Sequence, residues 1–116
     1  LEADRGWPDG APDVFVDLGE ASLHPDGAVV DADGNLWCAM FDAGKVIAYR
    51  PDGSVLQEVP FAAPQTTCPA FGGPNLATLF CTSAARDMPA DDGKPHGATF
   101  AAPETGRGQA EHRVRL

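Results

Sequence analysis

The sequence has no apolar run longer than a strand, so no segment of it is expected to cross a bilayer as a helix. Positive charge is also scarce. Eight Lys and Arg stand against 17 Asp and Glu, which gives a net charge of −9. Nucleic acids and anionic membrane surfaces repel such a chain, and we expect neither as a partner.

Cysteine is rare, and its pattern argues against zinc ligation and against disulfide pairing. The three cysteines, Cys38, Cys68 and Cys81, have spacings that match no zinc pattern. An odd count without dense pairing suits a reducing compartment, so we expect a cytoplasmic protein, although a missing start would hide an N-terminal signal. All three are expected to be structural, and Cys38 and Cys81 to be small buried residues.

Familiar catalytic motifs are absent as well. The sequence contains no G-x-S-x-G elbow, no phosphate loop and no dinucleotide-binding fingerprint. The three histidines, His24, His96 and His112, are far apart in the sequence. The pattern therefore gives no support to a serine hydrolase or a nucleotide-dependent enzyme.

The stretch from Pro25 to Pro60 is the most regular part of the chain. Four short apolar runs are separated by glycine-bearing turns, of which Asp33-Gly34 and Asp52-Gly53 are typical. Such pairs favour tight hairpins because glycine adopts positive φ without steric cost. The pattern predicts a four-stranded antiparallel meander with strands at residues 28–30, 36–40, 46–49 and 55–59.

A second unit follows at a fixed distance. Leu36-Trp37-Cys38 and Leu79-Phe80-Cys81 lie 43 residues apart, and four strands in about 43 residues is the blade period of a β-propeller. We therefore predict an all-β fold with two four-stranded sheets side by side and no long helix. The second unit is predicted to have strands centred on residues 70–71, at 78–83, at 98–101 and near 112–116.

The first 24 residues are predicted to connect this pair of blades to an earlier one. The sequence begins at Leu1, and residues 14–18 look like the outer strand of a preceding blade. We therefore expect about two and a half blades, forming the C-terminal portion of one propeller domain. The expected divisions are residues 1–24 for the end of a blade and a connection, 25–67 for a blade, and 68–116 for the last blade.

Two features are candidates for function. The polar, proline-containing loop at residues 84–95 is too long for a tight hairpin, and it either rims a pocket or is a solvated insertion. Pro-Asp-Gly occurs three times, but Asp9 lies in an irregular lead-in and Asp52 joins two strands of one blade. Asp26 alone precedes a first strand, where loops converge on the propeller axis. A carboxylate there suits a hard cation, which prefers oxygen ligands.

Three blocks of the sequence together resemble the C-terminal part of the SMP-30/gluconolactonase/regucalcin-like family. They are PDGAVVDADGNLWCAMFDAGKVIAYRPDG, QTTCPAFGGPNLATLFCTSAARD and HGATFAAPETGRGQAEHRV. The resemblance runs from about Val14 to Val114. Phe71-Gly72-Gly73 with Asn75-Leu76 is its most distinctive part, and residues 96–100 are less glycine-rich than in the family.

The resemblance implies a six-bladed propeller that hydrolyses sugar lactones with one divalent cation, Ca²⁺, Zn²⁺, Mn²⁺ or Mg²⁺, on its axis. It implies that Asp26 is both a metal ligand and the general base that activates water. The other ligands and the substrate-orienting residues would lie upstream, in missing N-terminal blades or another chain. The alternative is a non-catalytic fragment, or a binding or structural propeller that completes itself by association.

Overall fold

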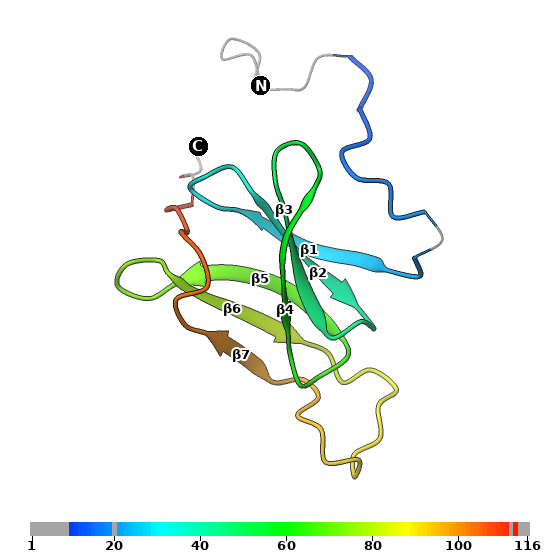
Figure 1. The fold of residues 1–116 in the computed structure, drawn as a ribbon. Coiled ribbons are helices and arrows are strands. Elements are labelled where there is room, and N and C mark those ends of the chain that lie inside the picture. Colours follow the sequence, from blue (N-terminus) through cyan, green and yellow to red (C-terminus); the bar gives the residue numbers. More distant parts are fainter. Residues whose placement is uncertain (1–9, 20, 112, 114–116) are drawn as a thin grey trace.

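The computed structural model describes residues 10–19, 21–111 and 113, which fold into two antiparallel sheets (Figure 1). The first sheet contains, in chain order, β1 (His24–Val30), β2 (Leu36–Phe41), β3 (Lys45–Tyr49) and β4 (Val55–Pro60). The second contains β5 (Thr66–Gly72), β6 (Thr78–Ser83) and β7 (Thr99–Ala102). The described residues contain no helix, which confirms the predicted all-β class.

The first sheet buries the middle of its two central strands on both faces. Residues 37–40 of β2 and residues 46–49 of β3 are all buried, whereas β1 and β4 alternate between partly buried and exposed positions. The predicted hairpin turns are present, and Gly34 and Gly53 adopt φ of +83° and +82°. The turn between β2 and β3, where Gly44 has φ of +62°, sets the register that places Trp37 opposite Ala48. A sheet covered on both sides is what a propeller blade requires.

A buried carboxylate organises the turn between β1 and β2. Asp31 is 3% exposed, and its Oδ1 accepts hydrogen bonds from the backbone N–H groups of Asp33 and Asn35, both at 2.9 Å. Its Oδ2 accepts from Asn35 Nδ2 at 2.9 Å and from Trp37 Nε1 at 2.8 Å. Burial opposes ionisation of Asp31, but these hydrogen bonds outweigh it and lower the pKa of the carboxyl. The Asp31 carboxylate is thus stabilised by hydrogen bonds from the turn and from Trp37, which replace its contacts with water.

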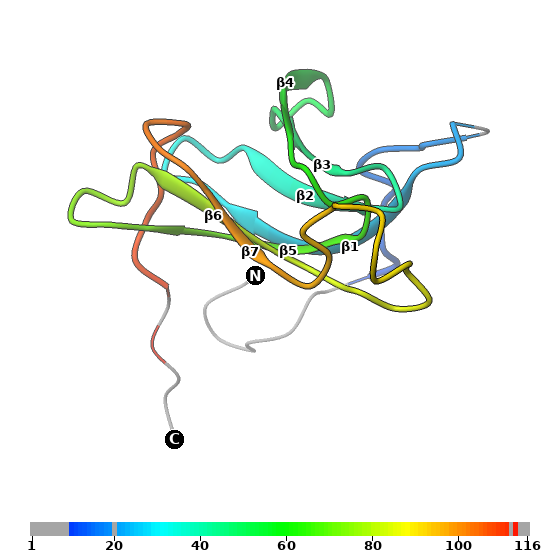
Figure 2. The same ribbon diagram turned by 90° about the horizontal axis from the view of Figure 1, so that it is seen from below.

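The two sheets pack face to face around Trp37. The buried interface is formed by residues from β2, β3 and β6, namely Trp37, Ala39, Val46, Ala48, Leu79 and Cys81. Phe71 of β5 meets the Trp37 ring edge-on, with ring centroids 5.1 Å apart and planes at 89°. This packing places β1 and β5, the first strands of the two sheets, side by side (Figures 1 and 2).

Trp37 and Phe80 occupy matching places, as the repeat predicted, but their surroundings differ. Each lies on the second strand of its sheet. Trp37 faces the second sheet, and Phe80 lies on the face of the second sheet that points away from the first. Trp37 is 1% exposed because the second sheet covers it, whereas Phe80 is 37% exposed. Cys38 and Cys81 match in the same way, and both are buried, as expected. Residues that are 43 positions apart therefore lie on the corresponding faces of the two sheets.

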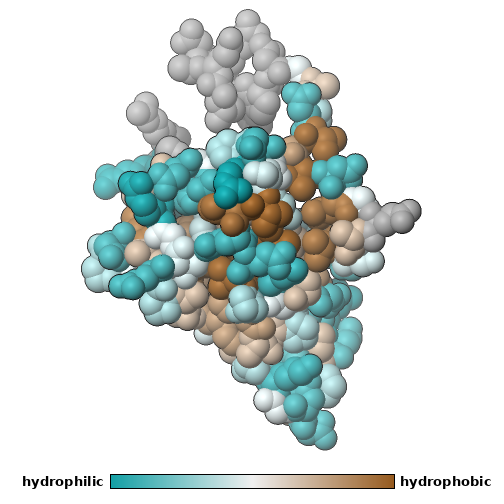
Figure 3. Space-filling view, in the orientation of Figure 1, coloured by the Kyte–Doolittle hydropathy of each residue, from teal (hydrophilic) through white to brown (hydrophobic). Residues whose placement is uncertain are grey.

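The strand predicted at residues 14–18 is wrong. These residues pair with no strand and instead cross the outer face of the first sheet, where Val16 and Leu18 pack against its buried side chains. The segment meets the β3–β4 turn, where a Cβ on Gly53 would lie 2.9 Å from the Phe15 carbonyl oxygen. Apolar contact with the sheet face, without backbone pairing, fixes its course. Figure 3 shows apolar side chains gathered where it crosses.

Three strands of the second sheet are described, and the third begins one residue later than predicted. The fourth strand predicted near residues 112–116 lies outside the described residues, apart from Arg113, which is not in a strand. Asp9 also lies outside the described residues. Within the described ranges, no helix is long and apolar enough to cross a membrane.

We predict that Asp31→Ala lowers the free energy of unfolding by about 3 kcal/mol, because it leaves the buried Trp37 N–H and the turn amides without their charged acceptor. Asp33→Ala is the matched control on the same turn. Its ion pair with Arg107 is exposed, and its loss should cost less than about 1 kcal/mol. Urea unfolding of the three proteins at neutral pH measures both effects.

The difference should also depend on pH in one direction. Because the folded-state pKa of Asp31 is lowered, its contribution is complete above the ordinary value of 3.8 and is lost as the pH falls through the folded value. The Asp31→Ala protein and the unsubstituted protein should therefore converge in acid. Equal stability at neutral pH would contradict the prediction.

Candidate functional site

Asp26 lies where the ladder between β1 and β2 is interrupted. Pro25 pairs with Met40 and Ala28 pairs with Cys38, so Asp26 and Gly27 stand opposite one residue of β2 and form a β-bulge. The Asp26 side chain is exposed. Bulges redirect side chains next to functional sites. The sequence predicted that Asp26 precedes the first strand, but β1 begins at His24, so the carboxylate lies within the strand, on its bulge.

A second bulge lies beside the first. On β5, Thr66 pairs with Ser83 and Cys68 pairs with Thr82, which leaves Thr67 as the extra residue. The Thr67 hydroxyl is 2.6 Å from that of Thr82. Because β1 and β5 are neighbours, the two bulges meet at the same end of the pair of sheets. Sequence reasoning missed this contact, although the repeat places Thr67 and Asp26 near equivalent positions.

The thiol of Cys38 lies behind Asp26. Its Sγ is 4.0 Å from the Asp26 carbonyl oxygen, a weak contact with the backbone of the bulge. Burial raises the pKa of Cys38, and the nearby Asp26 charge raises it further, against the opposing effect of this hydrogen bond. Cys38 is buried, as expected of a small packing residue, and its raised pKa keeps the thiol protonated at neutral pH.

The donor set around Asp26 fits one ligand of a hard cation and no more. A carboxylate oxygen is the donor that Ca²⁺ and Mg²⁺ prefer. Within residues 10–19, 21–111 and 113, no three His, Cys, Asp or Glu side chains gather in a group that could hold a metal ion. An ion at Asp26 would therefore need other ligands, such as carbonyl, amide or water oxygens or residues from elsewhere in the propeller.

The loop after β6 starts and ends at the Asp26 end of the sheets. It is anchored at its base, where Ser83 Oγ donates to the Ala98 carbonyl at 2.7 Å and Gln65 Nε2 donates to the Arg86 carbonyl at 3.1 Å. At its end the His96 side chain is 7% exposed, and its Nε2 lies 2.9 Å from Asp92 Oδ2. This hydrogen bond lowers the pKa of Asp92. The loop is thus partly folded, and its role as a pocket rim stays a prediction.

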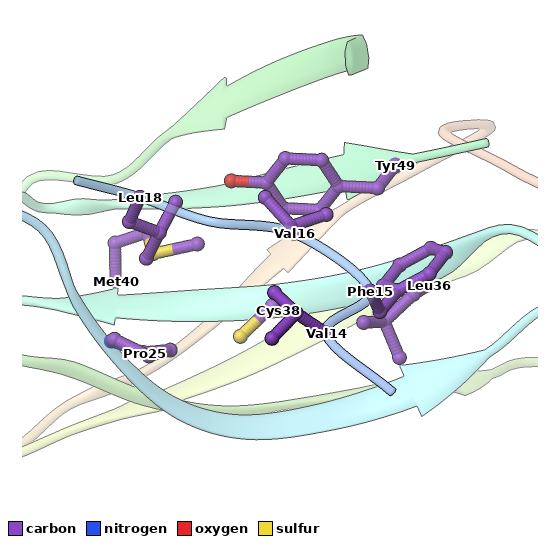
Figure 4. Close-up of a pocket in the computed structure, with 9 residues that line it drawn as sticks. All are labelled: Val14, Phe15, Val16, Leu18, Pro25, Leu36, Cys38, Met40 and Tyr49. Atoms are coloured by element: carbon purple, nitrogen blue, oxygen red, sulfur yellow. The ribbon is translucent and has the colours of Figure 1, made fainter. Parts of the chain in front are cut away.

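The described pocket with the most apolar lining lies elsewhere. It has a volume of about 270 Å³ and lies between residues 14–18 and the outer face of the first sheet (Figure 4). Leu36, Cys38, Met40 and Tyr49 form its floor, and Pro25 closes one side (Figure 4). No carboxylate lines it. The cavity is a gap in apolar packing and not the site of Asp26.

The other sequence candidates are structural, as predicted. Asp52 belongs to the β3–β4 turn, where its Oδ1 accepts from Ser54 N at 2.9 Å and from Ser54 Oγ at 2.6 Å. His24 is exposed at the start of β1, far in sequence from His96, and His112 lies outside the described residues. The structure therefore leaves Asp26 as the candidate for chemistry among the residues singled out from the sequence.

Two antiparallel sheets that pack face to face, with their first strands side by side, define a partial β-propeller. A family model described as SMP-30/Gluconolactonase/LRE-like region matches residues 3–85, and the chain belongs to this family. The resemblance seen in the sequence is thereby confirmed.

The relatives and solved structures agree with this assignment. The chain is 42% identical over 69 residues to a 6-deoxy-6-sulfogluconolactonase of Pseudomonas putida, covering 60% of this chain and 24% of that protein. It is 36% identical over 104 residues to an L-arabinolactonase of Azospirillum brasilense, covering 85% and 33%. A crystal structure of regucalcin, a calcium-binding protein from Agrobacterium tumefaciens, superposes with a TM-score of 0.88 at 38% identity, covering 100% of this chain and 40% of that one. The chain thus spans less than half of each of these proteins.

We predict that one thiol of the folded chain reacts quickly with an aromatic disulfide reagent. Cys68 is exposed, whereas Cys38 and Cys81 are buried. Burial raises the pKa of Cys81 to about 11, so little of the reactive thiolate exists at neutral pH. Absorbance should report one fast thiol in the native protein, three in guanidinium, and none that is fast in Cys68→Ala. Two or more fast native thiols would contradict the arrangement.

Proposed function

We propose that this chain forms the C-terminal part of a metal-dependent sugar lactone hydrolase, a carboxylic ester hydrolase in which Asp26 activates water. The observation that carries the proposal is the exposed Asp26 carboxylate on the bulge of β1, in a family whose relatives are named as lactonases. The resemblance noted in the sequence points to the same residue.

Asp26 would act as a proton acceptor and as an oxygen ligand. Its carboxylate takes a proton from water, the resulting hydroxide adds to the lactone carbonyl carbon, and the ring C–O bond breaks. The proton then passes to the leaving ring oxygen, which gives an open-chain hydroxy acid. A divalent cation, of which Ca²⁺, Zn²⁺, Mn²⁺ and Mg²⁺ are the candidates, would supply Lewis acidity at the carbonyl oxygen when bound.

The rest of the chain supports that role by fixing the backbone around Asp26. The bulge frees Asp26 from the ladder and exposes its side chain, while Pro25 and Ala28 on either side stay paired with β2. The carboxylate therefore lies on a strand whose flanking residues are paired on both sides of it. Sites built on strands are more precise than sites on mobile loops.

We predict that Asp26→Asn lowers hydrolysis of an aldonolactone by about 10²- to 10⁴-fold, the usual effect of losing a general base. The amide keeps nearly the same size and one oxygen donor, so the fold should persist while the proton acceptor and a negative charge are lost. The measurement is the rate in a protein that carries the complete propeller, at saturating Ca²⁺, Mn²⁺ and Zn²⁺ in turn.

Asp52→Asn is the matched control, because Asp52 caps a distal turn and its substitution should leave the rate nearly unchanged. Full activity of Asp26→Asn with every metal would show that the carboxylate is only a turn residue, and the proposed mechanism would fail.

A second candidate is a non-catalytic propeller that completes itself by association with another chain, and one observation favours it. The outer face of the second sheet carries Phe80 between Ala70 and Ala101, with Thr82 and Thr99 in the next row, and these residues are exposed. None of them is charged, although the chain carries a net charge of −9. The equivalent face of the first sheet, with Trp37, is covered by another sheet.

If this face is covered by a second copy, the 116-residue chain should self-associate, and Phe80→Lys should shift it towards the monomer, because burying an unpaired charge in an apolar contact is unfavourable. Val55→Lys is the control, since Val55 is also exposed but lies on β4. Sedimentation measures the distribution. A compact, stable monomer of the unsubstituted chain would contradict association.

A further inference from the structure

Gly27 of β1 lies where the backbone of β1 comes very close to the backbone of β5. A Cβ at this position would lie 2.8 Å from the Thr67 carbonyl oxygen, 2.8 Å from Cys68 Sγ and 2.9 Å from Cys68 Cα. A Cβ essentially never comes within 3.0 Å of a heavy atom of a residue that is not its chain neighbour. Two of these three atoms belong to the β5 backbone and have no rotamer by which to move away. Gly27 does not have a positive φ, so its lack of a side chain serves space and not backbone conformation.

The bulge that carries Asp26 depends on this contact for its position. Asp26 and Gly27 lie between the pairs that Pro25 and Ala28 make with β2, so the ladder does not fix them directly. A side chain of β2 also reaches the bulge, through the long contact of Cys38 Sγ with the Asp26 carbonyl. On its other side it rests on the backbone of Thr67 and Cys68. Because a Cβ at position 27 would meet backbone atoms there, β5 leaves the bulge no room for a side chain on this side.

The β5 bulge is itself anchored to the first sheet. The Thr66 side chain is fully buried, and its hydroxyl lies 2.8 Å from the Met40 carbonyl and 3.1 Å from the Lys45 carbonyl. Beside it, the hydroxyl groups of Thr67 and Thr82 are 2.6 Å apart. The surface against which Gly27 packs is therefore held from both sheets, and it cannot retreat from a larger residue without breaking these bonds.

We propose that Gly27 is a positioning residue, which sets the place of the Asp26 carboxylate by packing without a side chain against the Thr67–Cys68 backbone of β5. The inference rests on the proposed function in taking Asp26 as the reacting group and metal ligand. A methyl group at position 27 pushes the β1 bulge away from β5 and moves the adjacent carboxylate with it. A displacement near 1 Å costs about 10²-fold in rate when a reacting group must be held in place.

The test compares Gly27→Ala with Gly72→Ala in a protein that carries the complete propeller. Gly72 is also tightly packed, since a Cβ there would lie 2.8 Å from the Phe80 ring, but it is at the other end of β5 from the bulge. Gly27→Ala should lower kcat by about 10²-fold and weaken the binding of Ca²⁺ and Mn²⁺ measured by titration calorimetry. Gly72→Ala should leave kcat and both affinities within about threefold of the unsubstituted values.

Cys68→Ala separates the backbone from the thiol. It removes Sγ but keeps the Thr67 oxygen and the Cα of residue 68, so it should change kcat little and should not rescue Gly27→Ala. If Gly27→Ala does not fold, N-ethylmaleimide provides the second perturbation. Attached to Cys68 of the folded protein, it should weaken Ca²⁺ and Mn²⁺ binding at least tenfold, and it should have no effect on Cys68→Ala.

The outcomes distinguish this inference from the proposed function. Unchanged kcat and metal affinity in Gly27→Ala, while Asp26→Asn is inactive, would overturn the positioning role and leave the function standing. Rescue of Gly27→Ala by Cys68→Ala would also overturn it, because the thiol and not the backbone would then set the spacing. Full activity of Asp26→Asn would defeat the proposed function itself.

Discussion

The apolar interface around Trp37 is the contact on which the rest of the structure depends. Trp37 is the largest of the fully buried side chains, and it lies between the sheets against Phe71 while its indole N–H donates to the buried Asp31 carboxylate. An aromatic ring held at both its edge and its polar atom has one orientation. That orientation fixes how the second sheet lies on the first, and therefore which strands become neighbours.

The C-terminal stretch reinforces the same interface from outside. The Ala32 N–H donates to the Arg107 carbonyl at 2.7 Å, and the Arg107 side chain pairs with Asp33 at 2.8 Å. Gly106 and Gly108 lie so close to Phe71 that a Cβ on either would clash with its ring. This stretch follows β7 of the second sheet and reaches back to the β1–β2 turn of the first. The C-terminal stretch therefore holds the turn after β1 by a backbone hydrogen bond and by an ion pair.

The opposite end of β1 has irregular strand pairing and an exposed carboxylate. There the ladders of both sheets are interrupted by bulges, and an exposed carboxylate replaces the buried one. Asp31 and Asp26 differ only in environment. Asp31 receives four hydrogen bonds and shapes a turn, whereas Asp26 stands on an unpaired part of the strand where it can meet a cation or water. Under the proposed function this position faces the propeller axis, and the complete site draws its ligands from several blades.

The sequence by itself determined that the first sheet has four strands and that the 43-residue repeat exists, because turn glycines and apolar periodicity are local signals. It placed the start of the first strand after Asp26, whereas β1 begins at His24 and includes that residue, because a bulge does not follow the apolar alternation. It misplaced residues 14–18, since an apolar segment packed on a sheet face has the same pattern as a strand. The role of Asp31 and the need for glycine at position 27 were decided only by the tertiary structure. Both depend on residues brought together from different strands, Trp37 in one case and Thr67 and Cys68 in the other, and no spacing in the chain encodes how closely two backbones approach.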